Sequence, residues 1–187
     1  IKQKSHQHDL SLKHQEWLVK NFKNVEGHTV NLDELFLAFS TSMSKFENEH
    51  GMANSRARLR MTTLYQVAAA NKGIVVGTGN KVEDFGVGFY TKYGDGGVDI
   101  SPIADCNKTQ VWELGKELGI LNEIIKAAPT DGLWDDGRTD EGQLGLKYEE
   151  LEEAMDNPYS PNRAKYENIR KQNLHKMEPI PVCKIPS

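Results

Sequence analysis

Apolar residues recur every three or four positions over most of the chain, which is the spacing of amphipathic α-helices. Leu10, Trp17, Leu18 and Phe22 predict a first helix that ends near Lys23. The same spacing, between capping residues and glycine or proline, predicts further helices over 33–39, 56–71, 108–118, 121–128, 148–155 and 161–174. The expected N-caps of these helices are Asp33, Asn54 or Ser55, Asp105 or Asn107, and Ser160.

Short apolar runs between these helices have the length of β-strands and cover 28–32, 74–76 and 99–103. Strands that alternate with helices predict an α/β fold with a mostly parallel sheet. Ligands of such sheets bind beyond the carboxyl ends of the strands. The apolar run 74–76, predicted as a buried strand, leads directly into 77–97, a segment with seven glycines. Because glycine loses much backbone entropy on folding, we expect a bound ligand to order this segment.

Composition narrows the class of protein. The 187 residues are 37% hydrophobic and 27% charged, as in an ordinary globular domain. A net charge of −4 argues against a nucleic-acid partner. Cys106 and Cys183 form no disulfide framework, which indicates a reducing, cytoplasmic compartment. The longest strongly apolar run, 35–39, is too short to cross a membrane.

Short motifs do not identify a ligand. A G-x-G-x-x-G fingerprint starting at Gly77 fails at Val82, and a Walker A loop is absent from the sequence. His6 and His8 lack further ligands at the spacing of a zinc site, so we interpret them as surface histidines. The acidic residues of 135–141 do not follow the spacing of a calcium loop.

Charged residues near the glycine-rich segment have two interpretations each. Arg56 and Arg60 share a helix face, and Arg58 points roughly the other way. Spacing alone favours a solvated face, but guanidinium groups also suit an anion clamp. Glu83 either holds Mg²⁺ or pairs with Lys81. The remaining lysines of the region are either surface groups or ligand contacts.

Longer segments of the sequence identify a protein family far more specifically than these short motifs do. The chain closely resembles the ammonia-dependent NAD synthetases in ANSRARLRM (53–61), GTGNKVEDFGVGFYTKYGDGGVDISPIAD (77–105), PTDGLWDDGRTDEGQ (129–143) and the terminal HKM (175–177). The resemblance implies a Rossmann-like, three-layer fold of the adenine-nucleotide α-hydrolase type, with 1–187 as a single domain and a homodimer as the assembly. It also implies amidation of deamido-NAD to NAD with ATP and ammonia, through an acyl adenylate, with release of AMP and pyrophosphate.

The resemblance implies site residues but assigns no residue to a covalent step. It implies ATP contacts at Thr78, Lys108 and Thr130, and a Mg²⁺ carboxylate at Glu83. The implied contacts to deamido-NAD, partly across a dimer interface, are Arg58, Lys92, Asp99, His175 and Lys176. We expect these residues to surround a common cavity.

We also predict structural roles for two segments, 130–145 and 160–187. The stretch 130–145 has no apolar period, so we expect a mobile lid loop that closes over the adenylate and excludes water. Asp131 lies in this loop beside Thr130. Residues 160–187 are expected to form a C-terminal helix and an extended tail.

One part of the family pattern is absent. The family carries an SGGxDS loop after its first strand, which grips pyrophosphate and supplies a second Mg²⁺ carboxylate, and the 187 residues contain no such motif. DGGVDI (95–100) is no substitute, because both serines are missing. We therefore expect the N-terminal strand and loop to be missing, the sheet to have an unprotected edge, and the 187 residues alone to be inactive or weakly active.

Alternative functions remain open. One is another ATP-pyrophosphatase that aminates a carboxyl or carbonyl group, such as the synthetase domain that makes GMP, although such domains lack the GFYTKYGDGG stretch (88–97). A second is a non-catalytic dimer that binds a dinucleotide. The nitrogen source is also open, since glutamine-dependent relatives carry an additional amidase domain; KYGDGGVDISPIAD (92–105) is more similar to the ammonia-using branch.

Overall fold

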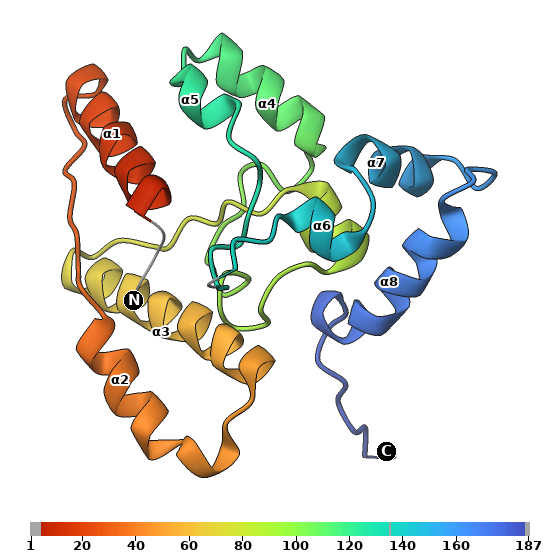
Figure 1. Ribbon diagram of the computed structural model, residues 1–187, viewed down its shortest axis with the longest axis horizontal. Coiled ribbons are helices and arrows are strands. Elements are labelled where there is room, and N and C mark those ends of the chain that lie inside the picture. The colour runs from red at the N-terminus through yellow and green to blue at the C-terminus, as the bar shows by residue number, and fades with distance from the viewer. Residues whose placement is uncertain (1–4, 135, 186–187) are drawn as a thin grey trace.

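Helices and long connections make up the fold in the computed structural model, which describes residues 5–134 and 136–185. The helical elements are α1 (Ser5–Asn21), α2 (Asp33–Ser42), the 3₁₀ turn η1 (Ser44–Phe46), α3 (Glu49–Ala70), the π-helix η2 (Lys81–Val87), α4 (Lys108–Glu117), α5 (Asn122–Ile125), α6 (Asp140–Leu144), α7 (Tyr148–Asp156) and α8 (Arg163–Met177). In Figure 1, α2 and α3 lie on one side of the central loops and α7 and α8 lie on the other.

Several helix boundaries differ from the sequence predictions. Asn48 caps α3, where we expected Asn54 or Ser55; its side chain accepts a hydrogen bond from the Gly51 amide at 2.8 Å. The polar stretch before the arginines concealed this earlier start. Leu32 rather than Asp33 is the N-cap of α2, and Asn162 rather than Ser160 is the N-cap of α8.

Other boundaries are confirmed. Asn107 begins α4 with a capping box, in which its amide donates to Gln110 Oε1 at 2.8 Å. Gly119 follows α4 in the left-handed region, with φ +69°. The predicted loop 130–145 is wrong at its C-terminal end, because Thr139 caps the short helix α6 and Gly145 ends it.

Strand pairing is much reduced relative to the prediction. Among the described residues the only bridge is an isolated parallel one between Val76 and Ile100, and residues 28–32 form an extended connection rather than a strand. Val75 is buried, whereas Ile74 and Val76 are 59% and 53% exposed. Val75 is therefore buried but lies outside the bridge, Val76 is bridged but exposed, and the prediction of a buried strand over 74–76 is wrong.

The hydrophobic core lies between η2, α7 and α8. Its buried side chains are Val82, Val87, Leu144, Leu146, Tyr148, Leu151, Ala154 and Tyr166. Asn80 starts η2 by accepting hydrogen bonds from the amides of Val82 and Glu83 at 3.0 and 3.1 Å. Side chains of α8 satisfy the carbonyls at its other end, since Asn173 donates to Val87 O at 3.0 Å. The core and α8 together hold η2 in place.

Helices α1, α2, α3 and α5 lie outside this core and contact one another in pairs. Lys13 of α1 and Glu123 of α5 form an exposed ion pair, with Nζ and Oε2 2.7 Å apart. The guanidinium of Arg56 on α3 lies 4.8 Å from the ring centre of Phe36 on α2. None of the described helices is both long and apolar enough to span a bilayer.

Candidate functional site

The glycines of 77–97 permit close packing of the protein against itself. A Cβ added to Gly94 would lie 2.9 Å from the Cβ of Ala57, so glycine lets this loop approach α3. Gly88 ends η2 with φ +66°, and a Cβ there would lie 2.6 Å from the Cβ of Asn173. Our expectation that a ligand explains these glycines is therefore incomplete, because internal packing already requires two of them.

Glu83 of η2 and Lys108 of α4 form a largely buried ion pair. Lys108 Nζ lies 3.0 Å from Glu83 Oε1, and the two side chains are 18% and 16% exposed. The alternative pair of Glu83 with Lys81 is wrong, since Lys81 lies 3.7 Å from Asp105 instead. Two residues implied by the resemblance, one for Mg²⁺ and one for ATP, therefore lie together.

Two further residues, which sequence reasoning missed, complete this cluster. The hydroxyl of Tyr148 lies 2.5 Å from Glu83 Oε1 and 3.2 Å from Asp140 Oδ2. Lys108 Nζ also lies 5.0 Å from the ring centre of Tyr148. Burial, followed by the neighbouring Glu83, raises the pKa of Asp140 to about 6 and raises the pKa of Tyr148. The TDE sequence at 139–141 was the available signal, but its spacing alone indicated a solvated acidic run.

A second cluster gathers most of the residues implied for deamido-NAD. Arg58 Nε donates to Lys92 O at 3.2 Å, and Lys92 Nζ donates to His175 O at 2.5 Å. Lys176 Nζ donates to Gly88 O and Tyr90 O, each at 2.8 Å. Burial lowers the pKa of Lys176. The chain thus brings three cationic side chains, Arg58, Lys92 and Lys176, and the backbone of His175 to one region where 88–92 meets α8.

Asp99 plays a structural role beside the parallel bridge. Its carboxylate accepts from the Val75 amide at 2.7 Å and from the Tyr65 hydroxyl at 3.2 Å. Tyr65 and Arg58 both belong to α3, seven positions apart. Asp99 therefore contacts the same helix, α3, that carries Arg58 of the second cluster. Among the described residues no hydrogen bond joins Asp99 to that cluster.

Thr78 lies at a separate hollow. It lines a cavity of about 240 Å³ between α3, residues 75–78, the 94–98 loop and Asp131. Arg58, Glu83 and Lys108 do not line this cavity. The cavity beside Thr78 therefore does not bring the implied residues together, and a common cavity stays a prediction.

The three arginines of α3 have three different environments. Arg56 donates to Leu133 O at 2.5 Å, and Arg60 lines the cavity beside Thr78. Arg60 Nη2 is buried and has no hydrogen-bond partner within 5–134 and 136–185. Burial, followed by the charge of Arg56, lowers the pKa of Arg60. The interpretation as a solvated face is wrong for Arg56 and Arg60, which are both partly buried.

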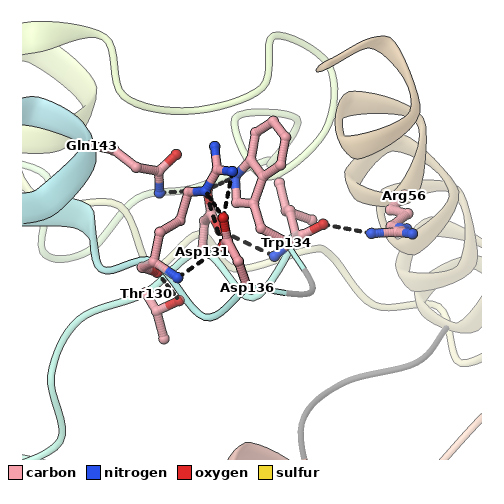
Figure 2. Close-up of polar contacts among 8 residues, drawn as sticks. Arg56, Thr130, Asp131, Trp134, Asp136 and Gln143 are labelled. Atoms are coloured by element: carbon pink, nitrogen blue, oxygen red, sulfur yellow. Dashed lines mark hydrogen bonds and ion pairs between the residues drawn. The ribbon is translucent and has the colours of Figure 1, made fainter. Parts of the chain in front are cut away.

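The loop from Thr130 onward folds around Asp131 (Figure 2). Asp131 accepts from Trp134 Nε1 at 3.1 Å and from Gln143 Nε2 at 3.2 Å. Thr130 Oγ1 donates to Arg138 O at 3.1 Å, and the Arg138 guanidinium lies 4.1 Å from the Trp134 ring centre. These contacts hold the loop together, and the Arg56 hydrogen bond to Leu133 O attaches it to α3. Asp135 lies outside the described residues.

The described residues contain no group of three or more histidine, cysteine or acidic side chains arranged to hold a metal ion. Glu83 nevertheless fits the demands of Mg²⁺, which often takes one or two protein carboxylates and completes its shell with water and phosphate oxygens. Lys108 beside it would meet the same phosphates. The donor set is therefore compatible with Mg²⁺ bound together with a nucleotide.

A glycine-rich segment that follows a parallel bridge, with a carboxylate on its helix paired to a lysine of α4, is typical of nucleotide-binding proteins. The chain belongs to the NAD synthase family, whose model matches residues 2–185. It is 44% identical over 142 residues to the NH₃-dependent NAD⁺ synthetase of Carboxydothermus hydrogenoformans, covering 74% of the chain and 58% of that relative. It is 40% identical over 140 residues to the synthetase of the same description from Methanosarcina acetivorans, covering 74% of the chain and 54% of that relative.

The chain spans about half the length of the curated relatives it matches. Among solved structures it is similar to an NMN synthetase from Francisella tularensis, with a TM-score of 0.88 and 31% identity, over 98% of this chain and 75% of that one. An NH₃-dependent NAD synthetase from Campylobacter jejuni shares the fold, with a TM-score of 0.71 and 24% identity, over 98% and 74% of the two chains.

Proposed function

We propose that this protein catalyses the ATP-dependent amidation of deamido-NAD to NAD with ammonia, through an acyl adenylate, with release of AMP and pyrophosphate. The observation that carries the proposal is the family match over residues 2–185. A carboxylate is a poor electrophile, so the nicotinate acid must first be converted to a species with a good leaving group. Attack of its carboxylate on the α-phosphorus of ATP forms that adenylate, and ammonia then displaces AMP.

The protein's part in this chemistry is positioning and neutralisation of charge. Thr78, Lys108 and Thr130 are proposed to contact ATP, with Lys108 meeting its phosphates. Glu83 would hold Mg²⁺, which neutralises phosphate charge when bound. The pair of Glu83 and Lys108 supports this assignment, because both groups are already fixed 3.0 Å apart.

Deamido-NAD is proposed to bind at the second cluster, through Arg58, Lys92, His175 and Lys176, with Asp99 nearby. Three cationic side chains in one region, Arg58, Lys92 and Lys176, support the binding of an acidic, pyrophosphate-bearing dinucleotide. We further propose a homodimer in the cytoplasm, with 1–187 as one domain. The Val76–Ile100 bridge would then belong to the mostly parallel sheet of a Rossmann-like three-layer fold.

A second candidate function is the amidation of nicotinate mononucleotide. The observation that favours it is the high structural similarity to the NMN synthetase from Francisella tularensis. Both candidates use the same acid group and the same activation by ATP. They differ in whether the enzyme must also accommodate an adenylate half attached to the substrate.

Formation of the amide product from each acid, with ATP, Mg²⁺ and ammonium chloride, tests the proposed reaction. We expect NAD, AMP and pyrophosphate in equal amounts, resolved by chromatography. The 187 residues by themselves contain no SGGxDS motif, so we expect them to bind the acid but to turn over slowly or not at all. Rapid AMP formation by these residues would contradict the second expectation alone.

Arg58→Ala is expected to weaken binding of deamido-NAD to the 187-residue chain about tenfold, because it removes one charge-assisted contact. Titration calorimetry measures the dissociation constants. Lys116→Ala, which removes a positive charge from exposed α4, is the control and should leave binding unchanged. Tighter binding of nicotinate mononucleotide than of deamido-NAD would favour the second candidate.

We propose that 130–145 acts as the lid of this site. In the ligand-free chain, amide hydrogen exchange over 130–134 is expected to be faster than in the middle of α3, and to slow when ATP and deamido-NAD are added. Arg56→Ala should accelerate exchange at these amides further, because it removes the hydrogen bond to Leu133 O. Arg58→Ala serves as the control from the same helix. Full protection of the loop without ligand would argue against a lid.

A further inference from the structure

Tyr148 joins two carboxylates that lie far apart in the sequence. Its hydroxyl is 2.5 Å from Glu83 Oε1 and 3.2 Å from Asp140 Oδ2. Asp140 is 6% exposed and Tyr148 is fully buried, whereas the Glu83 side chain retains 16% exposure. The row therefore has two buried members, Asp140 and Tyr148, and two partly exposed members, Glu83 and Lys108.

The number of hydrogens available determines the direction of each hydrogen bond in this row. A tyrosine hydroxyl has one hydrogen to donate, and the shorter contact assigns that hydrogen to Glu83. Asp140 then contributes most when it carries a proton and donates to the Tyr148 oxygen. The other oxygen, Asp140 Oδ1, is buried and has no hydrogen-bond partner among the described residues, so an ionised Asp140 would be poorly stabilised there.

Rigid neighbours fix both inner residues. The ring of Tyr148 packs in the core and meets the ring of Trp112 edge to face, with centroids 6.0 Å apart. Asp140 begins α6, and its amide donates to Pro129 O at 3.0 Å. Neither residue has freedom to follow Glu83, so Glu83 takes its position from them.

We propose that Asp140 and Tyr148 are positioning residues, which hold the Glu83 carboxylate in the orientation that binds the divalent cation. The proposal rests on the proposed function, in which Glu83 is the cation ligand. Asp140 acts through Tyr148 and does not itself bind the cation, because it lies behind the tyrosine and is more deeply buried than Glu83.

Binding of Mn²⁺ to the folded chain tests this role. The measured quantity is the decrease of the free Mn²⁺ signal in electron paramagnetic resonance as protein is added. Loss of an outer-shell partner typically weakens metal affinity about 10- to 100-fold. We expect at least about a tenfold loss for Asp140→Leu and for Tyr148→Phe. Asp140→Asn should bind Mn²⁺ within about twofold of the wild type, because an amide keeps the shape and the hydrogen bond to Tyr148.

Two controls separate this role from simpler ones. Tyr166→Phe removes a hydroxyl from another buried tyrosine of the same core and should leave Mn²⁺ binding unchanged. Circular dichroism verifies that each variant is folded. If Asp140→Asn loses Mn²⁺ as completely as Glu83→Gln, Asp140 is a direct ligand and the positioning role is overturned.

The remaining outcomes distinguish the inference from the proposed function. Wild-type affinity in Asp140→Leu, together with lost binding in Glu83→Gln, overturns the inference and leaves the proposed function standing. Unchanged binding in Glu83→Gln, or no binding by the wild type, overturns Glu83 as the cation ligand and the positioning role with it.

Discussion

Lys108→Met is expected to lower the free energy of unfolding by about 2–4 kcal/mol, although it introduces an apolar side chain. The substitution leaves the Glu83 carboxylate mostly buried without its cation, since the two side chains are 18% and 16% exposed. Removal of one partner from a buried ion pair costs more than the pair itself contributes, because an uncompensated charge remains. Urea denaturation of the folded chain measures the effect.

Lys81→Met is the matched control for this prediction. Lys81 lies 3.7 Å from Asp105, and the two side chains are 41% and 102% exposed, so the pair is screened by water. We expect a change within about 0.5 kcal/mol. Adding Glu83→Gln to Lys108→Met should restore part of the lost stability. Equal destabilisation by Lys81→Met and Lys108→Met would show that burial of the Glu83 pair is not the cause.

Gly88→Ala is expected to destabilise the chain by about 2–4 kcal/mol, through two additive causes. Gly88 has φ +66°, a left-handed conformation that alanine adopts only with strain. The new Cβ would also lie 2.6 Å from the Cβ of Asn173 and 3.3 Å from its backbone oxygen. α8 would therefore have to move away from η2, and the contacts that Lys176 and Asn173 make there would weaken.

Gly119→Ala separates the two causes. Gly119 has nearly the same backbone angle, φ +69°, but a Cβ added there meets no atom within 4 Å. We expect a loss of about 1 kcal/mol, the cost of the left-handed conformation alone. Chemical denaturation of both variants gives the difference. A Gly88→Ala variant no less stable than Gly119→Ala would mean that α8 accommodates the methyl group without cost.

The predicted contacts to deamido-NAD and ATP show which parts of the candidate site could be predicted from the motifs. The motifs pointed to Glu83 and Lys108 separately, from segments 25 positions apart, and the fold places them together. They also pointed to Arg58, Lys92 and Lys176, whose side chains meet where 88–92 contacts α8, and to His175, whose carbonyl accepts from Lys92 there. The motifs assigned no role to Asp140, which lies within 129–143, or to Tyr148, because neither spacing nor residue type distinguishes a buried acid from a solvated one.

By itself, the sequence determined the family, most of the helices and several of their ends. Helical periodicity and the caps at Asn107 and Gly119 depend on residues within a few positions of one another, so they are visible in one dimension. The cap at Asn48 was as local, but a long polar stretch offered several equivalent candidates.

Only the tertiary structure decided the π-helical form of 81–87, the reduction of the sheet to one bridge, and the row from Asp140 to Lys108. These features depend on contacts between distant segments: α8 satisfies the carbonyls of η2, and the packing of α7 places Tyr148 beside Glu83. Burial and pairing of charges arise from such contacts, and a sequence pattern records only which residues are available to make them.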